Sequence, residues 1–185
     1  DTLAAMRLAK QAGAFTIAIV NVVSSTIARE ADGVLYTWAG PEIAVATTKA
    51  YSAQLAALYL ISVKIARVRG LISIGDERAL CAELQRLPEC VTEALKCQPD
   101  MQRIATLYAN RPSVFFLGRG LDYAAALEAS LKLKEISYIH SEAYAAGELK
   151  HGTISLIEDN ILVIGVLTQS ELYEKTVSNM VECKS

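Results

Sequence analysis

The amino-acid sequence predicts an α/β fold with two incomplete units, each a parallel sheet flanked by helices, joined by a helical connector. Short apolar runs rich in β-branched residues alternate with amphipathic helical patterns before residue 70, which is typical of buried parallel strands covered by helices. The same alternation returns after residue 110. The stretch between has no strand pattern, so two separate sheets are favoured. One compact domain with a helical insertion is the alternative.

The first unit is expected in residues 1–70. A helix opens the chain and ends at Gly13, since glycine adopts the left-handed conformation that often ends a helix. Strands are predicted near residues 16–22 and 33–38, with a short helix between them.

A long helix then begins at Thr47 or Thr48, whose hydroxyl groups are natural N-caps, and ends near Gly70. Its most apolar run, Ala50–Val63, is shorter than the roughly 20 residues needed to cross a bilayer. We therefore expect a helix buried in the core, and no membrane partner.

Residues 71–110 are expected to form the connector, as two or three amphipathic helices broken at Pro88 and Pro99. This region contains neither the alternation nor the β-branched runs of a strand.

The second unit is expected in residues 111–185. Its predicted strands lie near residues 113–118 and 161–167, and a long helix from about Tyr123 to Ile139 follows the first strand. Both ends of the chain fall inside an α/β unit. We therefore expect a fragment that holds the back part of one domain and the front part of another.

The charge balance and the cysteines exclude several classes of site. With 18 basic and 20 acidic residues the formal net charge is −2, and the lack of a basic stripe argues against nucleic acid. None of the four cysteines forms a C-x-x-C pair, and no histidine lies near the first three, which argues against a zinc site. No metal and no cofactor are expected. Helical spacing places Cys90 and Cys97 on one face, where both are expected to be buried. The N-terminus has no secretory signal, which favours the cytoplasm.

Three charged side chains share one face of the predicted long helix. Glu128, Lys132 and Glu135 are spaced by four and three residues. One interpretation is a solvated surface pair worth about 0.2–0.5 kcal/mol, and surface ion pairs far outnumber catalytic ones. The other is a carboxylate base beside an ammonium group that stabilises developing negative charge. Spacing alone favours the first.

The chain has two histidines, His140 and His151. His140 is expected to end the long helix, where an imidazolium interacts favourably with the helix dipole. His151 precedes a glycine in a loop, and histidine is the usual proton shuttle near neutral pH. We expect a structural role for His140 and a chemical one for His151.

The sequence LGRG stands at the end of the strand predicted at 113–118. It resembles a phosphate-binding turn, but a tight strand-to-helix connection is the alternative.

Two long stretches carry a family resemblance. PEIAVATTKAYSAQL and FFLGRGLDYAAALEASLKLKEISYIHSEAYAAGELKHG resemble, in order and spacing, the isomerase part of the glucosamine-6-phosphate synthase family. That part has two sugar isomerase (SIS) domains, each a parallel sheet flanked by helices. The resemblance implies that residues 1–70 end the first SIS domain, that 71–110 connect the two, and that 111–185 begin the second.

The resemblance also implies an activity and a set of site residues. The family makes glucosamine 6-phosphate from fructose 6-phosphate, using ammonia that a glutaminase domain of the same parent chain releases from glutamine. Glu135 matches the base that moves a proton between sugar carbons 1 and 2, and Lys132 matches the lysine beside it. His151 matches the ring-opening histidine, which reaches in from the neighbouring subunit of a homodimer. Val45 and Thr47 match a backbone and a hydroxyl contact to the sugar.

The sequence departs from the family pattern in two ways. The family usually has serine where this chain has Thr47, so the hydroxyl group is kept and a methyl group is added. The phosphate loop is expected before Asp1, the Schiff-base lysine beyond Ser185 and the glutaminase domain elsewhere. We therefore expect the 185 residues to bind hexose phosphate weakly and to lack synthase activity on their own.

Two further functions compete with the synthase interpretation. One is a non-catalytic SIS sensor that binds a sugar phosphate and regulates a partner, although a sensor has no need of base, lysine and histidine together. The other is a related SIS enzyme that acts on another amino sugar or on a fructosamine phosphate.

Overall fold

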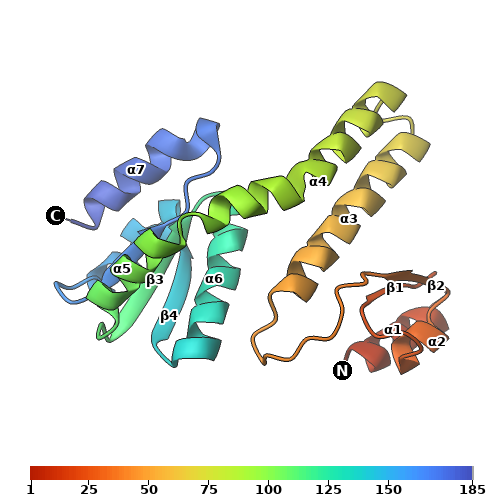
Figure 1. Ribbon diagram of the computed structural model, residues 1–185, viewed down its shortest axis with the longest axis horizontal. Coiled ribbons are helices and arrows are strands. Elements are labelled where there is room, and N and C mark those ends of the chain that lie inside the picture. The colour runs from red at the N-terminus through yellow and green to blue at the C-terminus, as the bar shows by residue number, and fades with distance from the viewer. Residues whose placement is uncertain (185) are drawn as a thin grey trace. The chain divides into compact units, whose positions relative to one another are not determined.

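The computed structural model describes residues 1–184. The chain divides into two compact units, Asp1–Lys96 and the residues from Cys97 onward, and each unit contains its own parallel sheet (Figure 1). The prediction of two separate sheets is therefore confirmed. The division into residues 1–70, 71–110 and 111–185 stays a prediction.

The first unit is built from two strands and four helices. Its elements are α1 (Thr2–Gln11), β1 (Ile17–Val20), α2 (Thr26–Glu30), β2 (Gly33–Tyr36), α3 (Lys49–Val68) and α4 (Ile74–Leu95). Strands β1 and β2 are parallel, with Ile17 opposite Gly33. The Asp32 carboxylate fixes the start of the sheet, because it accepts hydrogen bonds from the backbone and hydroxyl groups of Thr16, at 2.9 and 2.8 Å.

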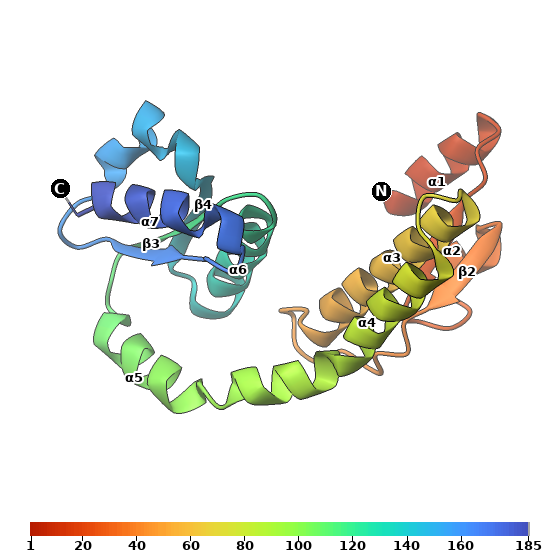
Figure 2. The same ribbon diagram turned by 90° about the horizontal axis from the view of Figure 1, so that it is seen from above.

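Helix α3 is exposed along most of its length, contrary to the buried core helix that its composition predicts. Ala57 is its one buried residue, while Leu58, Tyr59 and Leu60 are 49%, 53% and 46% exposed. Figure 2 shows α3 and α4 running side by side as an antiparallel pair. One neighbouring helix covers only part of the circumference of a helix that is apolar nearly all round.

Helix α4 continues through Pro88, so the predicted break at this residue is wrong. A proline removes one hydrogen-bond donor from a helix, and the other bonds of α4 carry the helix past it. Ser73 and Asp76 form a capping box at its start. Pro99 lies in the first turn of α5 (Gln98–Tyr108), where proline is well tolerated.

The two cysteines that were predicted to be buried are both exposed. Cys90 lies on α4 and Cys97 is the N-cap residue of α5. The prediction that helical spacing places them in the core is therefore wrong.

The second unit contains a parallel sheet of three strands in the order β4-β3-β5. Its elements are α5, β3 (Ser113–Gly118), α6 (Leu121–Ser137), β4 (His140–Ala145), β5 (Leu162–Gly165) and α7 (Tyr173–Glu182), with the short 3-10 helices η1 (Ala146–His151), η2 (Thr153–Leu156) and η3 (Ser170–Leu172). Helices α6 and α7 lie on opposite sides of this sheet (Figure 1).

Each face of this sheet has its own core. Val114 and Phe116 of β3 pack with Ala126 of α6. Leu117 faces the other way and packs with Leu149 of η1, and the side chains of both are fully buried. No helix in the described residues is long and apolar enough to cross a membrane.

Strand β4 was not predicted, and its position corrects the expectation for His140. Helix α6 ends at Ser137, and Tyr138 takes a left-handed conformation with φ of 59°. His140 therefore begins β4 and does not end a helix. The polar side chains of this strand, His140 and Glu142, hide the alternation that marks a half-buried strand.

Candidate active site

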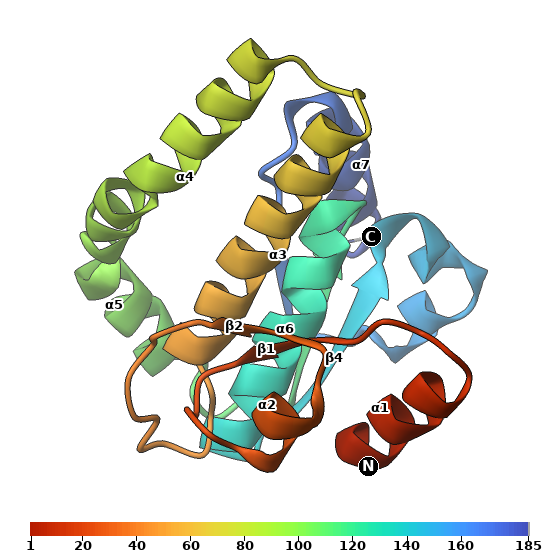
Figure 3. The ribbon, with the colours of Figure 1, turned by 90° about the vertical axis from the view of Figure 1, so that its right-hand side faces the viewer.

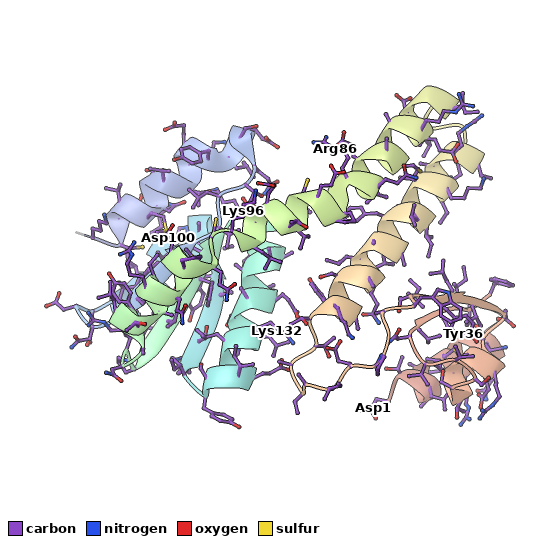
Figure 4. The ribbon with its side chains drawn as sticks, viewed as in Figure 1. Asp1, Tyr36, Arg86, Lys96, Asp100 and Lys132 are labelled. Atoms are coloured by element: carbon purple, nitrogen blue, oxygen red, sulfur yellow. The ribbon has the colours of Figure 1, made fainter. Side chains whose placement is uncertain are left out.

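Lys132 and Glu135 form a close ion pair on α6. The Lys132 ammonium group donates a hydrogen bond of 2.5 Å to Oε2 of Glu135, and lies 3.5 Å from Oε1 of Glu128. Figure 4 shows the Lys132 side chain extending from α6. The predicted sharing of one helical face by these three residues is therefore confirmed.

This cluster is partly shielded from solvent. The side chains of Lys132, Glu128 and Glu135 are 20%, 24% and 29% exposed. The exposed pair of Arg86 and Glu83 on α4 is 60% and 68% exposed, so the cluster on α6 is not an ordinary solvated pair. The hydrogen bond to Glu135 raises the pKa of Lys132, with the attraction of both carboxylates adding to it and partial burial opposing it. The protonated form of Lys132 is therefore favoured at this position.

The sheet holds α6 in place beneath this cluster. Ala126 is completely buried against β3, and the buried hydroxyl of Ser141 on β4 donates a hydrogen bond of 3.1 Å to the hydroxyl of Ser130. These contacts fix the height and rotation of the helix. The opposite face, which carries Lys132 and Glu135, is thereby fixed as well.

His151 lies apart from this cluster. It is the last residue of η1, is exposed, and makes no hydrogen bond or ion pair within the described residues. Leu149, two residues before it, packs into the core on the face of the sheet opposite α6. Figure 3 shows the turns of η1 and η2 beyond the C-terminal end of β4. A single chain therefore does not bring His151 against Glu135.

His140 takes part in a chain of polar contacts along the start of β4. Its Nδ1 lies 2.9 Å from the Ser113 hydroxyl, and its Nε2 lies 3.5 Å from Oε1 of Glu142. The Tyr144 hydroxyl donates to the same carboxylate, and burial, together with that hydrogen bond, raises the pKa of Tyr144 to about 12.

Val45 and Thr47 lie in the irregular segment between β2 and α3, in the first unit. Val45 is 92% exposed, Ala46 is buried and Thr47 is half-buried. Thr48 is the N-cap residue of α3, but its side chain makes no capping hydrogen bond. The backbone N–H of Ala50 instead donates to Oε2 of a glutamate eight residues earlier, at 3.4 Å.

The LGRG turn is a tight connection already filled by side chains of the unit. A Cβ atom at Gly118 would lie 2.4 Å from the backbone of Asp122, so only glycine permits this approach. The buried Asp122 carboxylate accepts bonds from the backbone N–H groups of Thr168 and Gln169, at 2.9 and 3.3 Å, and from the Thr168 hydroxyl. The side chain of Gln169 donates to the carbonyl oxygen of Arg119, at 2.7 Å. The backbone of Asp122 and the side chain of Gln169 therefore pack directly against the two glycines of the turn, which favours the tight-connection interpretation.

Sequence reasoning missed Asp122, Gln169 and Arg119, because their partners lie more than 40 residues away along the chain. No group of three or more potential metal-ligating residues occurs in residues 1–184.

Comparison with known proteins identifies the family. The SIS domain family model matches residues 1–64 and 107–185. The glutamine–fructose-6-phosphate aminotransferase (isomerizing) of Clostridium tetani is 56% identical over 182 residues, covering 98% of this chain. The enzyme of the same name from Caldanaerobacter subterraneus is 55% identical over 185 residues, the whole of this chain. The chain spans 30% of the length of each relative.

Solved structures show the same fold. The C-terminal domain of glucosamine-fructose-6-phosphate aminotransferase from Francisella tularensis superposes with a TM-score of 0.95 at 39% identity, covering 98% of this chain and 51% of that chain. A glucosamine-6-phosphate deaminase from Thermotoga maritima gives a TM-score of 0.76 at 26% identity, covering 97% of this chain and 52% of its own. The predicted SIS-type α/β fold is therefore confirmed.

Proposed function

The chain belongs to the SIS domain family, and from this premise we propose that it is the sugar-phosphate isomerase region of a glutamine–fructose-6-phosphate aminotransferase. Its substrate is fructose 6-phosphate and its product is glucosamine 6-phosphate. The ammonia comes from glutamine, through a glutaminase domain of the same parent protein. The identity of 56% with a relative that carries this name supports the proposal.

The observation that carries the chemistry is the partly shielded pair of Lys132 and Glu135. An ionised carboxylate is a suitable base for a proton bound to sugar carbon 1, and it can return that proton to carbon 2. Negative charge develops on the oxygen atoms of the enediol-like intermediate during this transfer. A fixed ammonium group next to the base stabilises that charge.

His151 serves ring opening in this proposal, and it acts across a homodimer. The cores beneath α6 and η1 lie on opposite faces of the sheet, which keeps His151 away from the Glu135 of its own chain. A second copy supplies the histidine instead. Exposure of His151 suits a residue that works in the neighbouring subunit.

The first unit supplies sugar contacts in this proposal. The backbone of Val45 and the hydroxyl group of Thr47 bind the open-chain sugar. Both residues lie in a segment with no regular structure, where backbone groups remain available for a ligand. We place the reaction in the cytoplasm, because the four cysteines are free thiols, as is usual in a reducing compartment.

A second candidate is a related SIS enzyme that acts on another amino sugar phosphate. The likeness to a glucosamine-6-phosphate deaminase supports it. The identity to that structure is 26%, against 56% to the aminotransferase, so the aminotransferase is favoured. A non-catalytic sensor is less well supported, because Glu135, Lys132 and His151 are all retained.

A chimeric enzyme tests the proposal. Residues 1–185 of this chain replace the matching segment of the Caldanaerobacter relative, which aligns with all of them. The chimera is expected to form glucosamine 6-phosphate from fructose 6-phosphate and glutamine, with the unmodified relative as positive control. A folded chimera that hydrolyses glutamine but forms no glucosamine 6-phosphate contradicts the proposal. The 185 residues alone are expected to form none.

A further inference from the structure

Arg119 ties together several segments of the second unit. Its backbone carbonyl, in the turn after β3, accepts bonds from the Gln169 side chain, at 2.7 Å, and from the Asp122 backbone, at 3.0 Å. Its guanidinium group donates twice to Oδ1 of Asn179 on α7, from Nη2 at 2.8 Å and from Nε at 3.2 Å. Asn179 is itself 6% exposed. The backbone carbonyl and the guanidinium group of Arg119 are therefore both held.

The held guanidinium group lies directly against Gly147 of η1. A Cβ atom placed on Gly147 would lie 2.9 Å from Nη2, 3.1 Å from Nη1 and 3.2 Å from Cζ of Arg119. Both terminal nitrogens are nearer to this position than Cζ is, so the Nη1–Nη2 end of the guanidinium group lies against the glycine. A side chain at residue 147 would require the end of Arg119 that bonds to Asn179 to shift.

The same segment carries His151. Ala146 and Leu149 of η1 are completely buried, and Gly147 between them rests on Arg119. These contacts define the path of the 3-10 turn whose last residue is His151. His151 makes no hydrogen bond of its own within the described chain, so only the backbone beneath it fixes its position.

We propose that Arg119 is a positioning residue for His151, acting through the contact of its guanidinium group with Gly147 while Asn179 holds that group. This proposal rests on the ring-opening role of His151 given above. Arg119 does not touch the sugar. It sets the place from which the imidazole reaches the substrate, and a displacement of about 1 Å at such a group costs roughly a hundredfold in rate.

The test uses the chimera and two substrates. Fructose 6-phosphate needs ring opening, whereas 5-deoxyfructose 6-phosphate lacks the hydroxyl group that closes the furanose ring and is already open. The variants are Arg119→Gln, which removes the planar cation, Gly147→Ala, which displaces it from the other side, and His151→Asn. Isomerisation is measured as kcat/KM for each substrate.

All three variants are expected to lose activity on fructose 6-phosphate and to keep most of it on the open-chain analogue. The loss for Arg119→Gln and Gly147→Ala is about 10- to 100-fold. Combined with His151→Asn, Arg119→Gln is expected to add no further loss, because a residue that acts only through His151 has nothing left to position. A purely structural role would reduce activity on both substrates and would add to the loss caused by His151→Asn.

The outcomes separate the two proposals. If His151→Asn loses activity equally on both substrates, the ring-opening role is wrong, and the positioning role fails with it. If His151→Asn is selective for the closed sugar but Arg119→Gln and Gly147→Ala are not, the positioning role alone is overturned. If Arg119→Gln does not fold, Gly147→Ala decides. Matched controls are Arg86→Gln on exposed α4 and Gly75→Ala, where a Cβ meets one atom at 3.4 Å; neither is expected to change activity.

Discussion

The helix that carries Lys132 and Glu135 and the loop that carries Val45 and Thr47 hold their side chains by different means. Helix α6 rests on a buried sheet and places its charged pair at 2.5 Å with the protein's own contacts. The loop leaves Val45 92% exposed. The pair proposed to transfer the proton is therefore pre-organised by this chain, whereas the sugar contacts proposed for the loop depend on the ligand and on what packs around it.

The largest effect that tests this comparison is expected at Glu135. In the chimera, Glu135→Gln keeps the shape of the side chain but removes the base. The turnover rate should fall by about 10²- to 10⁴-fold, the usual contribution of a positioned acid–base group. The Michaelis constant for fructose 6-phosphate should change much less, since Glu135 has no proposed contact with the phosphate group.

Glu128→Gln is the matched control, because Glu128 touches the same ammonium group at 3.5 Å but has no proposed contact with the sugar. Its effect should be far smaller. The decisive measurement is transfer of the sugar hydrogen between carbons 1 and 2 or its exchange with solvent. Normal transfer by Glu135→Gln would restore the interpretation of Lys132 and Glu135 as a structural ion pair.

The sequence predicted an element correctly where the apolar pattern of a segment matched the burial of that segment in the structure. The strand at 113–118 is a continuous apolar run and is buried, whereas β4 was missed because His140 and Glu142 give its exposed side the composition of a loop. The exposure of α3 was missed for the converse reason. The apolar composition of α3 predicts that another surface covers this helix. It does not show whether that surface belongs to this chain.

The same division holds for the candidate site. Lys132 and Glu135 are three residues apart, so helical geometry alone places them together. Arg119 and Asn179 are 60 residues apart, and no local pattern joins them. Gly147 is the one local signal that a close approach to the backbone occurs there, and only the structure identifies Arg119 as the residue that approaches.

Overpacking beneath α6 tests whether the contact of this helix with the sheet positions Lys132 and Glu135. Ala126 is completely buried between the helix and β3, so Ala126→Leu forces the helix away from the sheet. The free energy of unfolding of the 185-residue chain should fall by about 1–3 kcal/mol, as measured by urea unfolding followed by circular dichroism.

In the chimera, Ala126→Leu should also lower turnover, because Glu135 moves with the helix. Ile43→Ala in the loop is the control, since Ile43 is 95% exposed, and its unfolding free energy should change by less than about 0.5 kcal/mol. Unchanged turnover and stability in Ala126→Leu would mean that the packing of α6 does not position the pair.

Substitutions of Thr47 test whether the loop contributes a hydroxyl contact to the sugar. Thr47→Val removes the hydroxyl group but keeps the shape, and the Michaelis constant for fructose 6-phosphate should rise about tenfold, corresponding to a lost hydrogen bond of about 1.4 kcal/mol. Thr47→Ser keeps the hydroxyl group and should stay within about threefold of the parent chimera. Equal constants for the valine and serine variants would exclude a hydroxyl contact to the sugar. Steady-state kinetics of the three proteins decide this.

The smallest effect concerns the anchor at the start of α6. Asp122 accepts bonds from Thr168 and Gln169, and the bond from the Thr168 hydroxyl, followed by the backbone bonds, lowers its pKa against the opposing effect of burial. A carboxyl whose pKa is lower in the folded state stabilises that state fully above its unfolded pKa of about 3.9. This stabilisation is lost as the pH falls from there through the lowered folded pKa.

Asp122→Asn should therefore reduce the unfolding free energy of the 185-residue chain by about 1 kcal/mol at pH 7. The difference between the variant and the parent should shrink as the pH falls below about 4. Urea unfolding at a series of pH values measures it, and Asp100→Asn, whose side chain is 75% exposed, should show neither effect. A difference for Asp122→Asn that stays constant down to pH values well below about 3.9 would mean that the amide disturbs the packing of the turn. The charge of Asp122 would then not be what anchors α6.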